Sequence, residues 1–115
     1  MNRFTIQLEE IKAAYAAEPN PTLEVRLERI GRIEKMIKAN EEKICKALTA
    51  DFGVRNPSET RLAEFGMVSQ ACRFVRKNLK DWMRPVQMET PSYLSSSEAW
   101  IENQSIGVVG IISAW

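Results

Sequence analysis

The sequence predicts a mainly α-helical fold, a long helical hairpin that is followed by a C-terminal β-ribbon. Apolar residues recur at three- and four-residue steps in three segments, each bounded by proline or glycine, which is the pattern of amphipathic helices. The character changes after Pro85, where serines and prolines lead to the β-branched run 106–112. We therefore divide the 115 residues into an N-terminal helix and linker (1–21), a helical hairpin (22–85) and a loop with a β-ribbon (86–115).

The composition excludes several functional classes. Lys and Arg number 16 and Asp and Glu 15, so the chain lacks the basic excess of nucleic-acid-binding or membrane-surface proteins. The absence of histidine excludes a Ser-His-Asp or Cys-His catalytic set within these residues and a zinc site built on imidazole. Acidic residues stand where a signal peptide has its apolar core. We expect a cytoplasmic protein with no metal and with no nucleic-acid or membrane partner.

The first predicted helix covers Arg3 to Ala17. Its apolar positions are spaced by four, three and four residues and so share one face: Phe4, Leu8, Ile11 and Tyr15. Pro19 and Pro21 end the helix, because a residue before proline is displaced from the helical region.

The second predicted helix covers Thr22 to Ala50, with Thr22 as its N-cap. One face is apolar over about seven turns, through Leu23, Leu27, Ile30, Ile33, Ile37, Ile44 and Leu48. Gly31 lies inside this helix and either marks a close approach to another helix or has no structural role. Gly53 is expected to stop the helix in the left-handed conformation.

The third predicted helix runs from about Glu59 to Met83, with Ser58 as its N-cap. Its apolar stripe is Leu62, Phe65, Ser69, Cys72, Val75, Leu79 and Trp82, and we expect Trp82 in the core. The short connection to the preceding helix favours an antiparallel pair. Cys45 and Cys72 are interpreted as buried structural thiols, since neither has the strongly cationic setting of a reactive cysteine.

The C-terminal part is predicted to be loop and strand. Residues 85–97 are expected to be extended or looped, and 98–103 to form a short strand. The run 106–112 has the continuous apolar composition of a strand that is buried on both faces, as in parallel sheets. We expect the two strands to form a hairpin through 103–105. An alternative for this run is the opening strand of a larger nucleotide-binding sheet; because ligands bind beyond the carboxyl ends of such strands, Ser113, Ala114 and Trp115 would then lie at the ligand edge.

The segment 105–115, Ser-Ile-Gly-Val-Val-Gly-Ile-Ile-Ser-Ala-Trp, resembles the first strand of the cofactor domain in the aldehyde dehydrogenase superfamily. Three upstream segments are similar to the N-terminal helices of its class-3-like branch, and above all to coniferyl aldehyde dehydrogenases: Ala50–Gly53, Glu59–Glu64 and Leu79–Pro85. The likeness runs in order over about residues 20–115. It implies that the chain is an N-terminal piece of the α/β aldehyde dehydrogenase fold.

The resemblance also implies a reaction. Members of this superfamily oxidise aldehydes, here of the aromatic coniferyl type, to carboxylic acids with NAD or NADP through a cysteine thiohemiacetal. An asparagine holds the oxyanion, and a glutamate activates the water that releases the acid. In the family these three residues lie beyond the position that matches Trp115. No catalytic residue is therefore assigned in this chain, and the nucleophile's role is not transferred to Cys45 or Cys72.

A cofactor-binding role is carried over only to the end of the strand, where Ile112, Ser113, Ala114 and Trp115 match the lining of the family's NAD(P) cleft. Family members often have proline at the positions of Ser105 and Ala114. The resemblance implies that helical segment 22–84 packs on the cofactor domain and that strand 98–103 joins an extension used for homodimer contacts. We expect the 115-residue chain alone to be inactive and to bind no NAD or NADP tightly.

An alternative from another class is a self-standing helical protein-interaction module, in which the two amphipathic helices present a groove or dimerise. The segment 106–112 discriminates between the two hypotheses, because a helical adaptor has no use for a buried strand.

Overall fold

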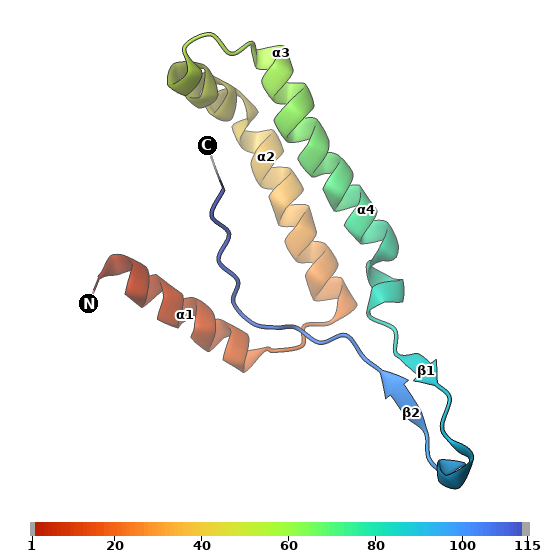
Figure 1. Cartoon of the computed structure of the whole chain (residues 1–115). Coiled ribbons are helices and arrows are strands. Elements are labelled where there is room, and N and C mark those ends of the chain that lie inside the picture. Colours follow the sequence, from red (N-terminus) through yellow and green to blue (C-terminus); the bar gives the residue numbers. More distant parts are fainter. Residues whose placement is uncertain (1, 114–115) are drawn as a thin grey trace. The chain divides into compact units, whose positions relative to one another are not determined.

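The computed structural model describes residues 2–113 and has a mainly helical architecture with a small antiparallel β-ribbon, which confirms the predicted fold class (Figure 1). The chain divides into two compact units. One unit is the helical segment Leu23–Arg84, and the other combines the first 22 residues with the residues from Pro85 onward. Among residues 2–113, no helix is both long and apolar enough to cross a membrane.

The helical unit is a hairpin. Helix α2 (Leu23–Phe52) leads through a short loop into α3 (Pro57–Thr60), a π-helical segment (Arg61–Gly66) and α4 (Met67–Trp82). In Figure 1, α4 returns along α2 in the opposite direction, as the sequence predicts for two long helices with a short connection. The continuous helix expected from Glu59 to Met83 is thus interrupted by six π-helical residues, Arg61–Gly66.

Few residues of the hairpin are fully buried, and most residues of the two predicted apolar stripes are buried or half-buried. Cys45, Cys72 and Leu79 are buried, and so is Thr60. Further apolar residues of the two stripes are half-buried: Leu23, Leu27, Ile30, Ile37, Ile44, Leu48, Phe65 and Val75.

Three expected core residues lie elsewhere. Ile33 sits at the edge of the α2 stripe and is 45% exposed. Leu62 is exposed because it lies in the π-helical segment, whose wider turn shifts residues from the face that an α-helix would give them. Trp82 is 43% exposed, so its expected core position is wrong: it is the last residue of α4, and its ring packs on exposed Phe74, with ring centroids 5.6 Å apart.

The helix ends show one confirmed prediction and one correction. Gly53 has φ +79°, and its N–H donates to the Thr49 carbonyl at 2.8 Å, as expected for a left-handed helix stop. The N-cap of α3 is Asn56 and not Ser58, because the Asn56 Oδ1 accepts the Ser58 N–H at 2.9 Å. Proline at position 57 then occupies the first helical position, where no donor is required.

The second unit contains α1 (Arg3–Ala17), whose bounds match the prediction, and a two-stranded ribbon. Strand β1 (Val86–Met88) pairs antiparallel with β2 (Ala99–Ile101), with Val86 opposite Ile101. A 3₁₀ turn at Ser92–Leu94 reverses the chain between them. The strand expected within 98–103 therefore exists, but its partner is β1, from the segment predicted as loop, and not 106–112.

The segment 106–113 is not a strand in this structure, which corrects the prediction. Ile106 is 90% exposed, Ile111 89% and Ile112 99%. A strand is defined by hydrogen bonds to a neighbour, and no strand of the described residues lies beside this segment. The composition expected of a doubly buried strand is present, but the sheet found among residues 2–113 is the β1–β2 ribbon, and it does not include this segment.

Candidate functional site

The residues predicted to line a cofactor cleft do not form a site among the described residues. Ile112 is almost fully exposed and Ser113 is exposed. Ala114 and Trp115 lie outside the described residues. The cofactor-binding role of the four residues therefore stays a prediction.

The chain that leads to these residues is held against α1. The Tyr15 hydroxyl donates a hydrogen bond of 3.0 Å to the Ser105 carbonyl, a contact between residues 90 apart in sequence. Two residues further on, Gly107 has φ +112° and lies beside the Tyr15 ring, where a Cβ would make an ordinary contact of 3.7 Å with ring carbon Cε1. Sequence reasoning placed Tyr15 on the apolar stripe of a helix and missed this contact, for which the sequence contains no signal.

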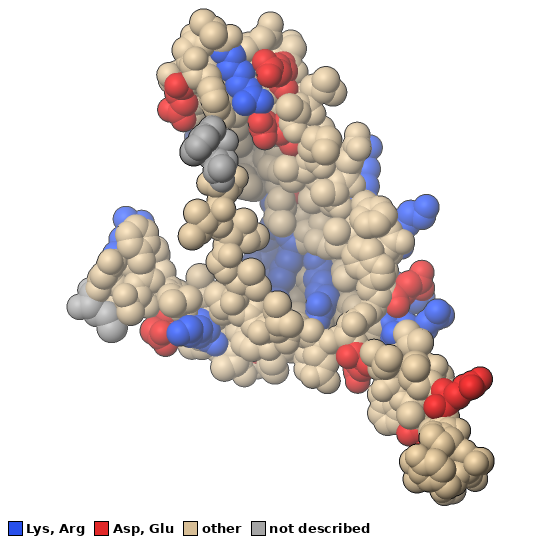
Figure 2. All heavy atoms as spheres, viewed as in Figure 1, with Lys and Arg blue, Asp and Glu red and all other residues tan. Residues whose placement is uncertain are grey.

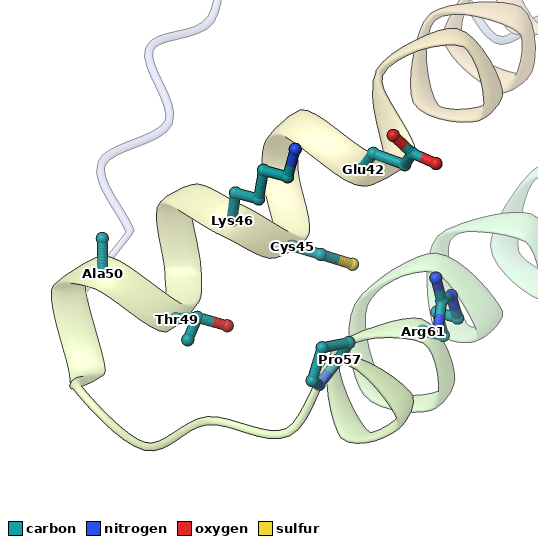
Figure 3. Close-up of a pocket in the computed structure, with 7 residues that line it drawn as sticks. All are labelled: Glu42, Cys45, Lys46, Thr49, Ala50, Pro57 and Arg61. Carbon is teal, nitrogen blue, oxygen red and sulfur yellow. The ribbon is translucent and has the colours of Figure 1, made fainter.

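The helical unit contains a surface hollow of about 690 Å³ near the turn of the hairpin (Figure 3). Its lining comes from the last turns of α2 and the start of the returning chain: Glu42, Cys45, Lys46, Thr49, Ala50, Pro57 and Arg61. Figure 3 shows the Cys45 side chain directed toward the gap between α2 and Pro57. The thiol belongs to a residue only 4% exposed, in agreement with the structural role predicted for it.

Of the three charged residues at this hollow, Glu42, Lys46 and Arg61, the arginine is paired. The Arg61 Nε lies 2.6 Å from a Glu41 carboxylate oxygen, and this hydrogen bond raises the pKa of Arg61 above its ordinary value. The Arg61 guanidinium is therefore already neutralised by a carboxylate, and the thiol at the hollow, that of Cys45, is buried. Within residues 2–113, no three Cys, Asp or Glu side chains gather as a metal site would require.

The charges on the surface are of mixed sign. Figure 2 shows Lys and Arg side chains interspersed with Asp and Glu, in keeping with the net charge of +1. Arg32 holds the Glu28 carboxylate through three contacts of 2.6–2.8 Å, and Arg55 pairs with Glu64 at 2.7 Å. These charges pair with one another, which is the arrangement of a solvated surface.

The chain is 33% identical over 108 residues to a coniferyl aldehyde dehydrogenase of Pseudomonas sp. strain HR199, a match that covers 94% of the chain and 22% of that protein. The chain belongs to the aldehyde dehydrogenase superfamily. No family model matches it.

Two further aldehyde dehydrogenases show the breadth of this likeness. The 4,4'-diaponeurosporen-aldehyde dehydrogenase of Staphylococcus aureus is 29% identical over 98% of the chain and 24% of its own length. The dimeric NADP-preferring aldehyde dehydrogenase of the dog is 25% identical over 100% of the chain and 25% of its own length. The chain thus spans between a fifth and a quarter of the curated relatives' lengths. The resemblance drawn from 105–115 and the upstream helical segments is confirmed.

Proposed function

We propose that this chain is the N-terminal part of an NAD- or NADP-dependent aldehyde dehydrogenase that oxidises aldehydes to carboxylic acids. The observation that carries the proposal is the 33% identity to a coniferyl aldehyde dehydrogenase over 94% of the chain. The chain itself supplies scaffold and no catalytic group, because the family's cysteine nucleophile, glutamate and asparagine lie beyond the position of Trp115.

We assign the chain's contribution to cofactor binding to residues 112–115. Ile112, Ser113, Ala114 and Trp115 match the lip of the family's cofactor cleft, and NAD or NADP supplies the hydride acceptor when it is bound. The exposure of Ile106, Ile111 and Ile112 supports this assignment. An extended run of β-branched residues with solvent on both faces is suited to become the first strand of a sheet built by further chain.

The helical and ribbon parts contribute surfaces. We assign the hairpin of α2 and α4 to packing on the cofactor domain, and the ribbon of β1 and β2 to homodimer contacts in the whole enzyme. Apolar side chains left exposed on the ribbon support the second assignment, since Val86, Met88, Trp100 and Ile101 are each between 45% and 57% exposed. Sedimentation of the whole enzyme should give a dimer, and Trp100→Lys should give a monomer.

The substrate is assigned as a coniferyl-type aromatic aldehyde, acted on in the cytoplasm. The relatives' names differ in substrate, and one of them is NADP-preferring. The assay must therefore compare coniferyl aldehyde with a long polyene aldehyde, each with NAD and with NADP. Faster turnover of the polyene aldehyde would overturn the coniferyl assignment and leave the aldehyde dehydrogenase assignment intact.

The decisive experiment reads the gene beyond the Trp115 codon in all three frames. We expect Asn-Tyr-Pro or Asn-Phe-Pro to follow, and a glycine-rich cysteine motif further on. Expression of that longer protein should give aldehyde-dependent formation of NADH or NADPH, whereas the 115-residue chain, as the matched control, should give none. A stop codon with unrelated sequence beyond it, together with a stable, monodisperse 115-residue product, would favour the helical interaction module instead.

A further inference from the structure

We propose that Tyr15 of α1 is a positioning residue that fixes the path by which the chain enters the segment 106–112. This inference rests on the proposed function, because it treats the segment as the first strand of the cofactor domain. Its structural part, a latch between α1 and residues 105–107, stands on the contacts alone.

The first contact is the hydrogen bond of the latch. The Tyr15 hydroxyl donates to the Ser105 carbonyl at 3.0 Å, and this pair is partly buried. Tyr15 is the third-last residue of α1 and is half-buried, while the apolar residues before it on the same stripe, Phe4, Leu8 and Ile11, are at least 41% exposed. Of these four residues of the α1 stripe, it is Tyr15 that contacts the C-terminal segment, through its hydroxyl and the Ser105 carbonyl.

The second contact is that of Gly107, which lies beside the Tyr15 ring with a positive φ. Its φ of +112° is a conformation that residues with a side chain rarely adopt, and its α-carbon passes beside the Tyr15 ring. Gly110, by contrast, has nothing within 4 Å of a Cβ placed on it and no positive φ. The two glycines of the same run thus differ: one turns the chain past the tyrosine, and the other lies in open space.

The two contacts act at successive points of the backbone. A hydrogen bond at residue 105 and a left-handed turn at 107 together restrict the direction in which residues 108–112 leave α1. Side chains of a strand alternate between its faces, so a change of path or register at its start would alter which residues face a sheet. In the proposed enzyme, α1 would therefore determine how Ile112 and Ser113 reach the cofactor cleft.

The first test uses the 115-residue chain and does not depend on enzyme activity. Thermolysin cleaves before Ile and Val, so the bonds 105–106 and 107–108 report on the latch, and the bond 110–111 is an internal control. Tyr15→Phe removes the hydroxyl and keeps the ring. Loss of one hydrogen bond should raise cleavage at the first two bonds by about two- to tenfold and leave 110–111 unchanged. Equal rates in both proteins at all three bonds would overturn the latch.

Two control pairs make this test specific. Tyr93→Phe removes the hydroxyl of a tyrosine that is 81% exposed and should leave all three cleavage rates unchanged. Gly107→Ala should accelerate cleavage at 105–106 and 107–108, because alanine disfavours the positive φ, whereas Gly110→Ala should not. Equal effects of the two glycine substitutions would contradict the role assigned to Gly107. Circular dichroism should show unchanged helix content in every variant.

The second test asks whether the latch positions the cofactor strand. In the longer enzyme, Tyr15→Phe should raise KM for NAD or NADP several-fold while KM for the aldehyde stays unchanged. Equal loss toward both ligands would reduce Tyr15 to a stabilising role and overturn the positioning claim. If the longer protein has no aldehyde dehydrogenase activity, the proposed function fails, yet the proteolysis result still decides the latch. The two failures are therefore distinguishable.

Discussion

The guanidinium of Arg76 on α4 occupies the space beside Gly31 of α2, where a Cβ would lie 2.9 Å from its Nη2. The same nitrogen donates to the Leu27 carbonyl at 3.4 Å, and Nε lies 3.4 Å from a Glu34 carboxylate oxygen. Of the two roles considered for Gly31, the structure supports the close approach of a neighbouring helix. The missing side chain lets an arginine cross from α4 to the backbone of α2.

This contact predicts a measurable coupling between the two positions. In an Arg76→Ala background, Gly31→Ala should stabilise the chain by about 1 kcal/mol, since alanine favours the helix by that amount. In the wild-type background the gain should be smaller, because the new methyl group displaces the guanidinium. Urea unfolding of the four proteins measures the difference as a coupling free energy. Equal gains in both backgrounds would show that Gly31 and Arg76 are independent.

The left-handed conformation of Gly53 predicts that a glycine-to-alanine substitution changes stability differently at Gly53 and at Gly66. Gly53→Ala should destabilise the chain by about 1 kcal/mol, because a Cβ disfavours φ +79° even though space is open there. Gly66 lies at φ −60°, with only an ordinary contact of 3.6 Å, so Gly66→Ala should leave stability unchanged or raise it by up to about 1 kcal/mol. Thermal unfolding of both variants is the measurement. A stabilising Gly53→Ala would refute the cap.

The buried hydroxyl of Thr60 predicts that a substitution at this position can stabilise the chain. Thr60 has no exposed surface, and its Oγ1 finds no hydrogen-bond partner among the described residues. Thr60→Val keeps the shape and removes the unsatisfied hydroxyl, so it should stabilise the chain by about 1 kcal/mol. Thr60→Ser keeps the hydroxyl and loses a methyl group, and should destabilise by a similar amount. Urea midpoints decide between these signs, and a destabilising Thr60→Val would indicate that the hydroxyl is satisfied.

The Glu28–Arg32 pair predicts a pH dependence. The hydrogen bond from Arg32 lowers the pKa of the Glu28 carboxyl below its ordinary value, with a smaller contribution from the positive charge. Since the folded pKa lies below the unfolded one, the stabilisation is present above the unfolded pKa and is lost as the pH falls through the folded pKa. NMR titration of the Glu28 carboxyl should show the lowered midpoint, and Arg32→Gln should return it toward its ordinary range. An unchanged midpoint in that variant would exclude Arg32 as the cause.

Local sequence patterns predicted much of the helical structure. The proline pair at 19 and 21 and the stripe from Phe4 to Tyr15 placed α1 correctly, and the stop at Gly53 was found within one residue. These features depend on neighbours within a few residues, which the sequence displays directly. The π-helical segment Arg61–Gly66 was missed, because its pattern of apolar residues is also that of an ordinary α-helix.

The candidate site was less predictable than the helices. Ile112 and Ser113 were selected by resemblance to a strand in the aldehyde dehydrogenase superfamily, and that resemblance is confirmed by the relatives, whereas their cofactor role stays a prediction. The described structure leaves both residues exposed. Whether a strand is buried depends on the strands and helices that pack beside it. An apolar, β-branched composition shows only that a strand can be buried and does not show that it is.

The amino-acid sequence by itself specifies the amphipathic helices, the ends marked by proline or by Gly53, and the family, because each is recorded in residue types at short spacings or in an ordered set of motifs. The tertiary structure decides the pairing of β2 with β1, the exposure of Trp82 and the contact of Tyr15 with Ser105. The two pairings join residues that are distant in the chain, and the exposure depends on which neighbours cover a ring. A local sequence pattern cannot predict these pairings or this exposure, because they depend on how whole helices and strands pack together.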